Sequence, residues 1–173
     1  MIINQPNWAV RIATLNLPVK TKMPGTIGSG VVWVYLNGIC VINLLSNIYP
    51  DLKLINLDRY NLFVPVIACL IAWPVINTAL KYFNQKDPAL ICLDEVVGML
   101  ASMCLVPINF MTVFFSLLLF RFFDILKPLG IKKVEQLPGA WGVLLDDVLA
   151  GIYANLSLRV FVWLFAQYYT FFE

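Results

Sequence analysis

The stretch Pro138–Asn155, read as PGAWGVLLDDVLAGIYAN, places two adjacent carboxylates, Asp146 and Asp147, within an apolar segment. This segment continues to Phe172, and Arg159 is its only other charged residue. Neighbouring carboxylates repel each other and lose hydration in such surroundings, so we expect a compensating cation nearby. The alternative is a helix N-terminus, where the helix dipole favours acidic side chains.

Small residues follow the two acids at helical spacing. Gly151 lies four residues and Ala154 seven residues beyond Asp147, which puts all three on one face of a helix. A stripe of small side chains lets a second helix approach closely. We therefore expect this helix to pack tightly against another one.

The composition of the whole chain indicates an integral membrane protein. Of its 173 residues, 61% are hydrophobic and only 13% are charged, and the mean hydropathy is +0.82. Soluble domains have about 45–50% apolar and about 25% charged residues. The net charge of +2 gives no indication of nucleic-acid binding. No repeat or linker divides the chain, so we expect a single domain over residues 1–173.

The N-terminus does not have the pattern of a signal peptide, and the cysteines do not have the pattern of a metal site. Met1–Lys22 has neither the apolar core nor the cleavage site of a signal peptide. None of the four cysteines forms a Cys-x-x-Cys motif, and all four fall in apolar stretches. We expect them to be reduced thiols that fill the core rather than disulfides or metal ligands.

The apolar runs predict an all-α membrane bundle of about five helices. A helix needs roughly 20 apolar residues to cross a bilayer, and Pro and polar loops separate the runs of this chain. Within Met1–Met23, a shared apolar face suggests a short helix at the bilayer surface. The expected membrane helices are Gly28–Tyr49, Tyr60–Leu80, Ala89–Val106, Phe110–Leu126 and a last helix from about Val143 to Tyr169.

The distribution of Lys and Arg predicts the orientation of this bundle. If the N-terminus is cytoplasmic, the outer loops hold only Lys53 and Arg59. Membrane proteins keep an excess of Lys and Arg in cytoplasmic loops. The same orientation brings four distant segments to the cytoplasmic helix ends: the PGT motif and the three segments that carry the acids. The basic residues of the inner loops are Arg11, Lys20, Lys22, Lys81, Lys86, Lys127, Lys132 and Lys133.

Five carboxylates at these helix ends indicate a site for a hard cation. The chain has no histidine, and its cysteines are not placed to bind metal. Oxygen ligands suit Mg²⁺, Mn²⁺ or Ca²⁺, whereas Zn²⁺ normally needs His or Cys. Mg²⁺ commonly bridges to a substrate phosphate. The candidate catalytic and metal-binding residues are Asp94, Glu95, Asp124, Asp146 and Asp147.

Candidate phosphate-binding groups lie on the same side. Thr26 and Ser29 belong to PGTIGSG, at the start of a helix where backbone N–H groups favour an anion. A Pro-Gly turn with a Thr or Ser cap would explain this motif equally well. Arg121 and Lys127 could bind phosphate, or they could form ion pairs beside Asp124. Lys127 could also simply extend to the bilayer surface.

Missing motifs exclude several phosphate-transfer mechanisms. Without histidine, a phosphohistidine or a His relay is impossible. No cysteine is followed by an arginine six positions later, and the chain has no Asp-x-Asp pair. These absences exclude a Cys-x5-Arg phosphatase loop and an aspartyl-phosphate hydrolase of the haloacid type. The pattern of CDP-alcohol transferases is also absent.

Four motifs together resemble one known family, phosphatidylglycerophosphatase A. They are PGTIGS (24–29), DEVVGM (94–99), FRFFDILKP (120–128) and GVLLDDVLAGI (142–152). The resemblance implies a helical enzyme of the bacterial inner membrane that hydrolyses phosphatidylglycerophosphate to phosphatidylglycerol and phosphate with Mg²⁺. It assigns site roles to Asp94, Glu95, Asp124, Asp146, Asp147, Thr26, Ser29, Arg121 and Lys127.

We therefore expect a phospholipid phosphatase that acts at the cytoplasmic leaflet through metal-activated water. A phosphoaspartate is the alternative route. A cation transporter or channel is the alternative function, because acids within a membrane also mark ion paths. The clustering of the acids at one face argues against transport, and a purely structural subunit would leave the five acids unexplained.

Overall fold

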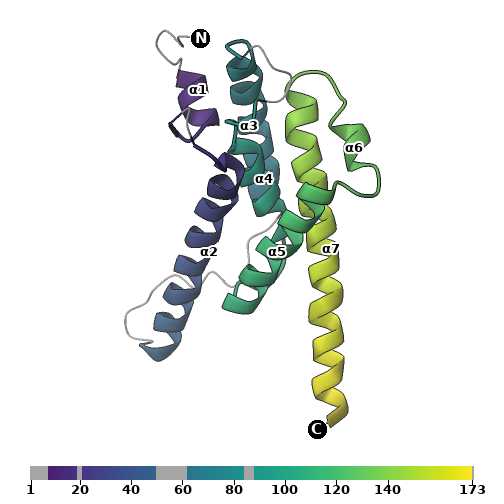
Figure 1. Cartoon of the computed structure of the whole chain (residues 1–173). Helices are drawn as coiled ribbons and strands as arrows, with labels where there is room; N and C mark the ends of the chain where they lie inside the picture. The colour runs from purple at the N-terminus through teal and green to yellow at the C-terminus, as the bar shows by residue number, and fades with distance from the viewer. Residues whose placement is uncertain (1–7, 19–20, 50–61, 84–87, 173) are drawn as a thin grey trace.

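The computed structural model describes residues 8–18, 21–49, 62–83 and 88–172, with side chains described as far as Leu164. These residues form helices and no strand, which confirms the all-α prediction. The helices are arranged as a bundle that opens toward one end (Figure 1). In chain order they are α1 (Trp8–Ala13), α2 (Pro24–Ile48), α3 (Phe63–Leu80), α4 (Leu93–Ser102), α5 (Phe110–Leu126), α6 (Ile131–Val134) and α7 (Ala140–Phe172).

Three helices among the described residues are long and apolar enough to cross a bilayer: Pro24–Ile48, Phe63–Leu80 and Ala140–Leu164. The structure thus supports three of the about five expected membrane helices, and the full count is not confirmed. Where we expected a helix over Ala89–Val106, α4 has only 10 residues. It is roughly 15 Å long, about half of the bilayer's hydrocarbon core.

The local backbone explains why α4 is short. Leu105 has a left-handed conformation (φ 57°) that a continuing helix does not allow. Pro107 follows, and then Asn109 begins α5 with a capping box, in which Asn109 and Thr112 each bind the other's backbone N–H. The short α4 and the 17-residue α5 thus form a helical hairpin beside the longer helices.

Tight packing joins α4 to α7, as the small-residue stripe predicts. A Cβ added at Gly151 would run into the carbonyl oxygen of Gly98, and one added at Gly98 would lie 2.7 Å from the carbonyl oxygen of Asp147. Ala154 is fully buried. Because neither glycine has a side chain, the α4 turn after Asp94 lies directly against the α7 turn that carries Asp147.

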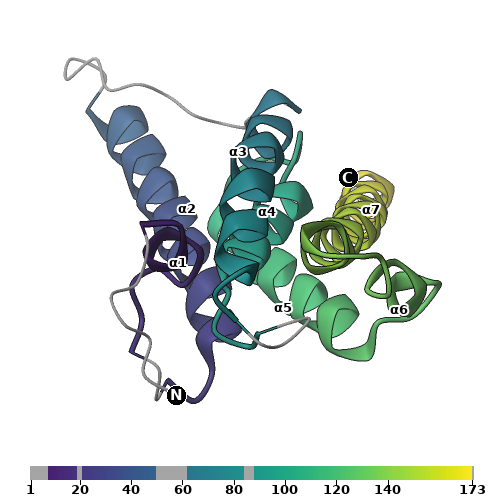
Figure 2. The ribbon, with the colours of Figure 1, turned by 90° about the horizontal axis from the view of Figure 1, so that it is seen from above.

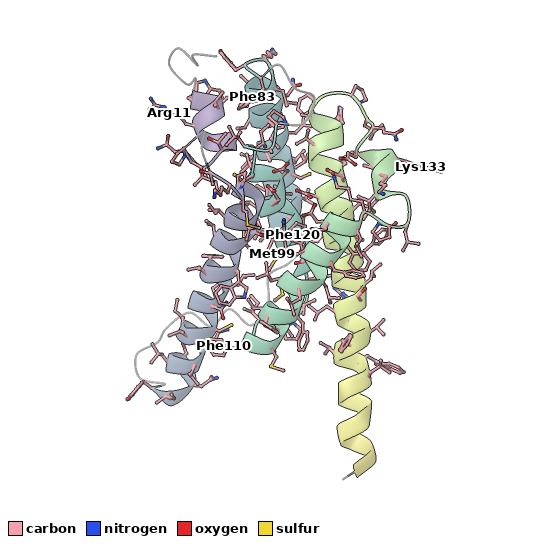
Figure 3. All side chains as sticks on the ribbon, viewed as in Figure 1. Arg11, Phe83, Met99, Phe110, Phe120 and Lys133 are labelled. Atoms are coloured by element: carbon pink, nitrogen blue, oxygen red, sulfur yellow. The ribbon has the colours of Figure 1, made fainter. Side chains whose placement is uncertain are left out.

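The apolar core holds the remaining helices around this pair. Met99 of α4 and Phe120 of α5 are fully buried and lie at the centre of the bundle (Figure 3). The four cysteines are free thiols, of which Cys40, Cys92 and Cys104 are buried, as expected.

The order of the helices brings four chain segments to one end. The starts of α2, α4 and α7 and the end of α5 all lie toward the same end as α1 and α6 (Figures 1 and 2). Arg11 of α1 and Lys133 of α6 mark this end (Figure 3). Of the cations that predict the orientation, Lys20, Lys53, Arg59 and Lys86 lie outside the described residues. The cytoplasmic placement of this end therefore stays a prediction.

Candidate active site

A cavity of about 280 Å³ lies where the four segments meet. Eight of the nine residues that the sequence singles out line it, and Ser29 is the exception. The lining residues from the predicted set are Thr26, Asp94, Glu95, Arg121, Asp124, Lys127, Asp146 and Asp147.

Three of the five acids form a cluster, which we call the three-carboxylate cluster. Each of Asp94, Glu95 and Asp147 has a carboxylate oxygen within 4.8 Å of the others. The first two lie in the first turn of α4, and the third lies in the second turn of α7. Asp94 and Asp147 are buried. Such close, poorly hydrated carboxylates favour a bound cation.

Glu95 shows the electrostatic state of this cluster most clearly. Burial raises the pKa of its carboxyl, its hydrogen bond with Asp94 opposes that rise, and the Asp124 charge adds to it. Its Oε2 is buried and accepts no hydrogen bond from the described residues. A buried acceptor of this kind normally has a partner, and a divalent cation would supply one. The donor set, three carboxylates and no His or Cys, fits Mg²⁺.

The other two acids have cationic partners, and we call them the paired acids. Asp124 Oδ2 lies 2.7 Å from Arg121 Nη1, one turn earlier on α5. Asp146 Oδ2 lies 2.6 Å from Lys127 Nζ, which also contacts Glu135 at 3.0 Å. The predicted set of five metal ligands thus divides into three clustered and two paired acids. The alternative that Arg121 forms an ion pair with Asp124 is the arrangement observed.

Lys127 reaches α7 because α5 ends at this residue in a left-handed conformation (φ 45°). Burial would lower the pKa of its ammonium, but the hydrogen bonds that it donates to Asp146 and Glu135 outweigh this and raise the pKa. Lys127 is therefore a fixed cation at neutral pH. The contact with Glu135 was not predicted, because nothing in the basic loop that contains it indicates a partner so close.

The start of α2 forms the opposite wall. Met23 is the N-cap residue and makes no side-chain cap, so neither Thr26 nor Ser29 caps this helix. Thr26 is exposed and lines the cavity, whereas the fully buried Ser29 donates its hydroxyl to the carbonyl of Gly25 at 3.0 Å. The uncapped N–H groups of the first turn can bind an anion.

Gly25 is a site residue that sequence reasoning did not single out. A Cβ at this position would collide with Glu95 Oε1 and lie 3.6 Å from Arg121 Nη1. The first turn of α2 thus packs directly on the three-carboxylate cluster. The signal available in the sequence was the glycine of the PGT motif.

Cys92 lies beside the cluster but is not a reactive thiol. It is fully buried at the N-cap position of α4. Burial, together with the charges of Glu95 and Asp94, raises its pKa to about 12. A thiol with a raised pKa is mostly protonated at neutral pH and is a weak nucleophile.

These features define a class: a helical membrane protein whose buried acids and cations gather at one end of an apolar bundle. Comparison with known sequences makes the assignment more specific. The chain belongs to the phosphatidylglycerophosphatase A family, whose sequence profile matches residues 11–162. The resemblance carried by the four motifs is thereby confirmed.

Two curated relatives match part of the chain. A Bacteroides thetaiotaomicron protein, provisionally named phosphatidylinositol-3-phosphatase, is 42% identical over 81 residues, which are 45% of this chain and 51% of that protein. Phosphatidylglycerophosphatase A of Haemophilus influenzae is 41% identical over 70 residues, 39% of this chain and 43% of the relative. The chain thus spans about half the length of the curated relatives it matches. No solved structure matches this chain.

Proposed function

We propose that this protein hydrolyses phosphatidylglycerophosphate to phosphatidylglycerol and phosphate with the help of Mg²⁺. One observation carries the proposal: a three-carboxylate cluster within 4.8 Å shares its cavity with Arg121 and Lys127. A cation site beside fixed positive charges suits a phosphomonoester. Family membership and the names of both relatives, which denote phosphatases of phosphorylated phospholipids, support the same chemistry.

Asp94, Glu95 and Asp147 are the residues that would hold the cation. When bound, Mg²⁺ lowers the pKa of an attacking water and offsets charge on the phosphoryl group. The second turn of α4 packs against the α7 turn of Asp147 through Gly98, so the positions of two ligands are fixed before the cation binds. Such preorganisation lowers the cost of assembling the site.

The two cations of the cavity would hold the phosphate. Arg121 and Lys127 are directed by short ion pairs with Asp124 and Asp146, so they lose little conformational freedom when an anion arrives. The raised pKa of Lys127 means that it acts as a charge and not as a proton donor. The N–H groups at the start of α2, with Thr26, would bind the remaining phosphate oxygens.

Water is the nucleophile that this arrangement favours. A phosphoaspartate would need one carboxylate to leave either the three-carboxylate cluster or an ion pair, which exposes an uncompensated charge in a buried site. A clustered carboxylate can instead accept a proton from the water. With a chiral thiophosphate substrate in isotopic water, we expect inversion at phosphorus; net retention would indicate a covalent intermediate.

The substrate's acyl chains would remain in the bilayer beside the apolar helices, while its headgroup enters from the cytoplasmic side of the bacterial inner membrane. Exposed Arg11, Lys22, Lys81, Lys132 and Lys133 support this orientation, since they lie in segments near the cavity end. Labelling of engineered cysteines at Lys22 and Lys133 should report the cytoplasm. If labels on cysteines engineered at Lys53 and Lys133 report the same side of the membrane, this orientation is contradicted.

Phosphate release by the purified protein tests the function. We expect release from phosphatidylglycerophosphate in Mg²⁺, none in excess chelator, and poor activity with Zn²⁺. Phosphatidylinositol 3-phosphate is the competing substrate that the Bacteroides relative suggests, and a higher kcat/KM for it would reassign the substrate. Cation flux through proteoliposomes without phosphate release would favour the transporter alternative.

A further inference from the structure

A second cavity, of about 320 Å³, lies between α3, α4 and α7, on the other face of the α4–α7 pair. Apart from Asn155 and Arg159, its walls are apolar or small, and no acidic residue lines it. We call it the α3–α7 groove. Its residues at the start of α3 are the N-cap residue Leu62 and Pro65, Val66 and Cys69, and those on α7 include Val148, Ile152 and Leu156.

A polar network at one end of this groove completes the end of α4. Asn155 Nδ2 donates to the carbonyl oxygens of Ser102 and Cys104 at 2.8 and 2.9 Å. These carbonyls follow the last turn of α4 and lack partners within a helix. In a bilayer, they must be satisfied by the protein. Asn155 of α7 therefore caps a helix that ends at membrane depth.

Arg159 is held by the same network. Its Nε donates to Asn155 Oδ1 at 2.8 Å, and its Nη2 donates to the carbonyl oxygen of Cys104 at 2.9 Å. All these partners are neutral, and Arg159 forms no ion pair within the described part of the chain. A cation on a membrane-length helix pairs with an acid or with backbone carbonyls, and within the described residues Arg159 has only the second kind of partner. The guanidinium is thus fixed in direction while its charge is uncompensated by the protein.

The position of Arg159 along α7 indicates where its partner comes from. It follows Ala140, the first residue of α7, by nineteen residues, which corresponds to about 28 Å along a helix axis, close to the roughly 30 Å of the hydrocarbon core. Asp147 lies only seven residues from the same helix start. The acidic cavity and Arg159 therefore lie at different depths of the bilayer. Between these depths, the groove extends from Val97 and Val148, beside the acid-bearing turns, to Arg159.

We propose that the α3–α7 groove binds an anionic phospholipid of the leaflet opposite the acidic cavity. The lipid phosphate pairs with Arg159, and one acyl chain lies along the apolar walls toward Val97 and Val148. Charge complementarity selects an anionic headgroup, because the lining offers one cation and no acid. This site is separate from the proposed phosphatase site and does not depend on its activity.

Native mass spectrometry of the full-length protein in a neutral detergent tests this proposal. The probes are dioleoyl phosphatidylserine, an anionic diester that a phosphomonoesterase does not hydrolyse, and dioleoyl phosphatidylcholine. We expect the protein to retain the anionic lipid about tenfold better than the zwitterionic one. The reason is that the anionic lipid forms a charge-assisted hydrogen bond with Arg159 without leaving a net charge in the groove. Arg159→Gln should abolish this preference, and Arg159→Lys should keep most of it.

Two further variants distinguish the groove from general electrostatics. Lys133→Gln removes an exposed cation on α6 and should leave the preference unchanged. Val66→Trp fills the groove from its exposed α3 wall and should lower retention of phosphatidylserine severalfold while Arg159 stays in place. If Arg159→Gln does not fold, Val66→Trp provides the decisive comparison with the wild type. Equal retention of both lipids by the wild type, an unchanged preference in Arg159→Gln, or unchanged retention of phosphatidylserine by Val66→Trp would overturn the proposal.

Discussion

The acidic cavity holds two kinds of carboxylate that the sequence alone does not distinguish. The paired acids, Asp124 and Asp146, each lie within 2.7 Å of a protein cation. In the three-carboxylate cluster, Glu95 and Asp147 form no ion pair in the described part of the chain. The paired acids therefore direct positive charges toward the cavity. The clustered acids repel one another and would be compensated by a cation from outside the chain.

Removing a clustered acid should have the largest effect. We expect Asp147→Asn to lower phosphate release more than about hundredfold, because the cation loses a ligand and its charge compensation. Circular dichroism should show unchanged helix content. The paired-acid control, Asp146→Asn, should lose less, since Lys127 keeps its contact with Glu135. Near-normal turnover in a folded Asp147→Asn protein would move the site elsewhere.

Thermal unfolding should separate the two kinds of acid without any activity assay. In chelator, Glu95→Gln should raise the unfolding temperature, because burial disfavours the Glu95 charge and neighbouring acids repel it. Mg²⁺ should stabilise the wild type, by about 2.7 kcal/mol at a hundredfold excess over Kd, but not this variant.

Asp124→Asn provides the control for the unfolding experiment. It should lower stability in chelator, since Arg121 loses its ion pair, and it should keep the response to Mg²⁺. If both variants respond alike to the cation, the distinction between clustered and paired acids is wrong.

Much of the site could be predicted from the sequence because its signals are local. An acid pair in an apolar helix, a glycine stripe and a Lys/Arg asymmetry each have a direct physical meaning. The short α4 could not be predicted, because residues 89–106 are as apolar as a true span and the cap of α4 comes from Asn155, far along the chain. The pairing of Lys127 with Asp146 is equally long-range.

The glycine that supports the cluster offers a smaller effect with a matched control. Gly25→Ala should weaken cation binding and lower turnover about tenfold, because the new Cβ displaces the Glu95 carboxylate. Gly30→Ala, on the same helix, meets no atom within 4 Å and should leave turnover unchanged. Steady-state kinetics over a Mg²⁺ titration measures both. Equal kinetics in the two variants would exclude a special role for Gly25.

The smallest effect should come from Glu135, the outer partner of Lys127. Its side chain is 38% exposed, and exposed ion pairs contribute only about 0–1 kcal/mol. We expect Glu135→Gln to raise KM less than about threefold at unchanged kcat. A large loss of kcat would mean that Glu135 acts on the reacting phosphate directly.

Binding of Mn²⁺, a paramagnetic substitute for Mg²⁺, tests the central claim most directly. Electron paramagnetic resonance can follow the titration of detergent-purified protein without any lipid substrate. We predict saturable binding by the wild type, more than about tenfold weaker binding by Asp147→Asn and Glu95→Gln, and a change within about threefold for Asp124→Asn. Absent binding by the wild type, or equal weakening in all three variants, would contradict a cation site formed by Asp94, Glu95 and Asp147.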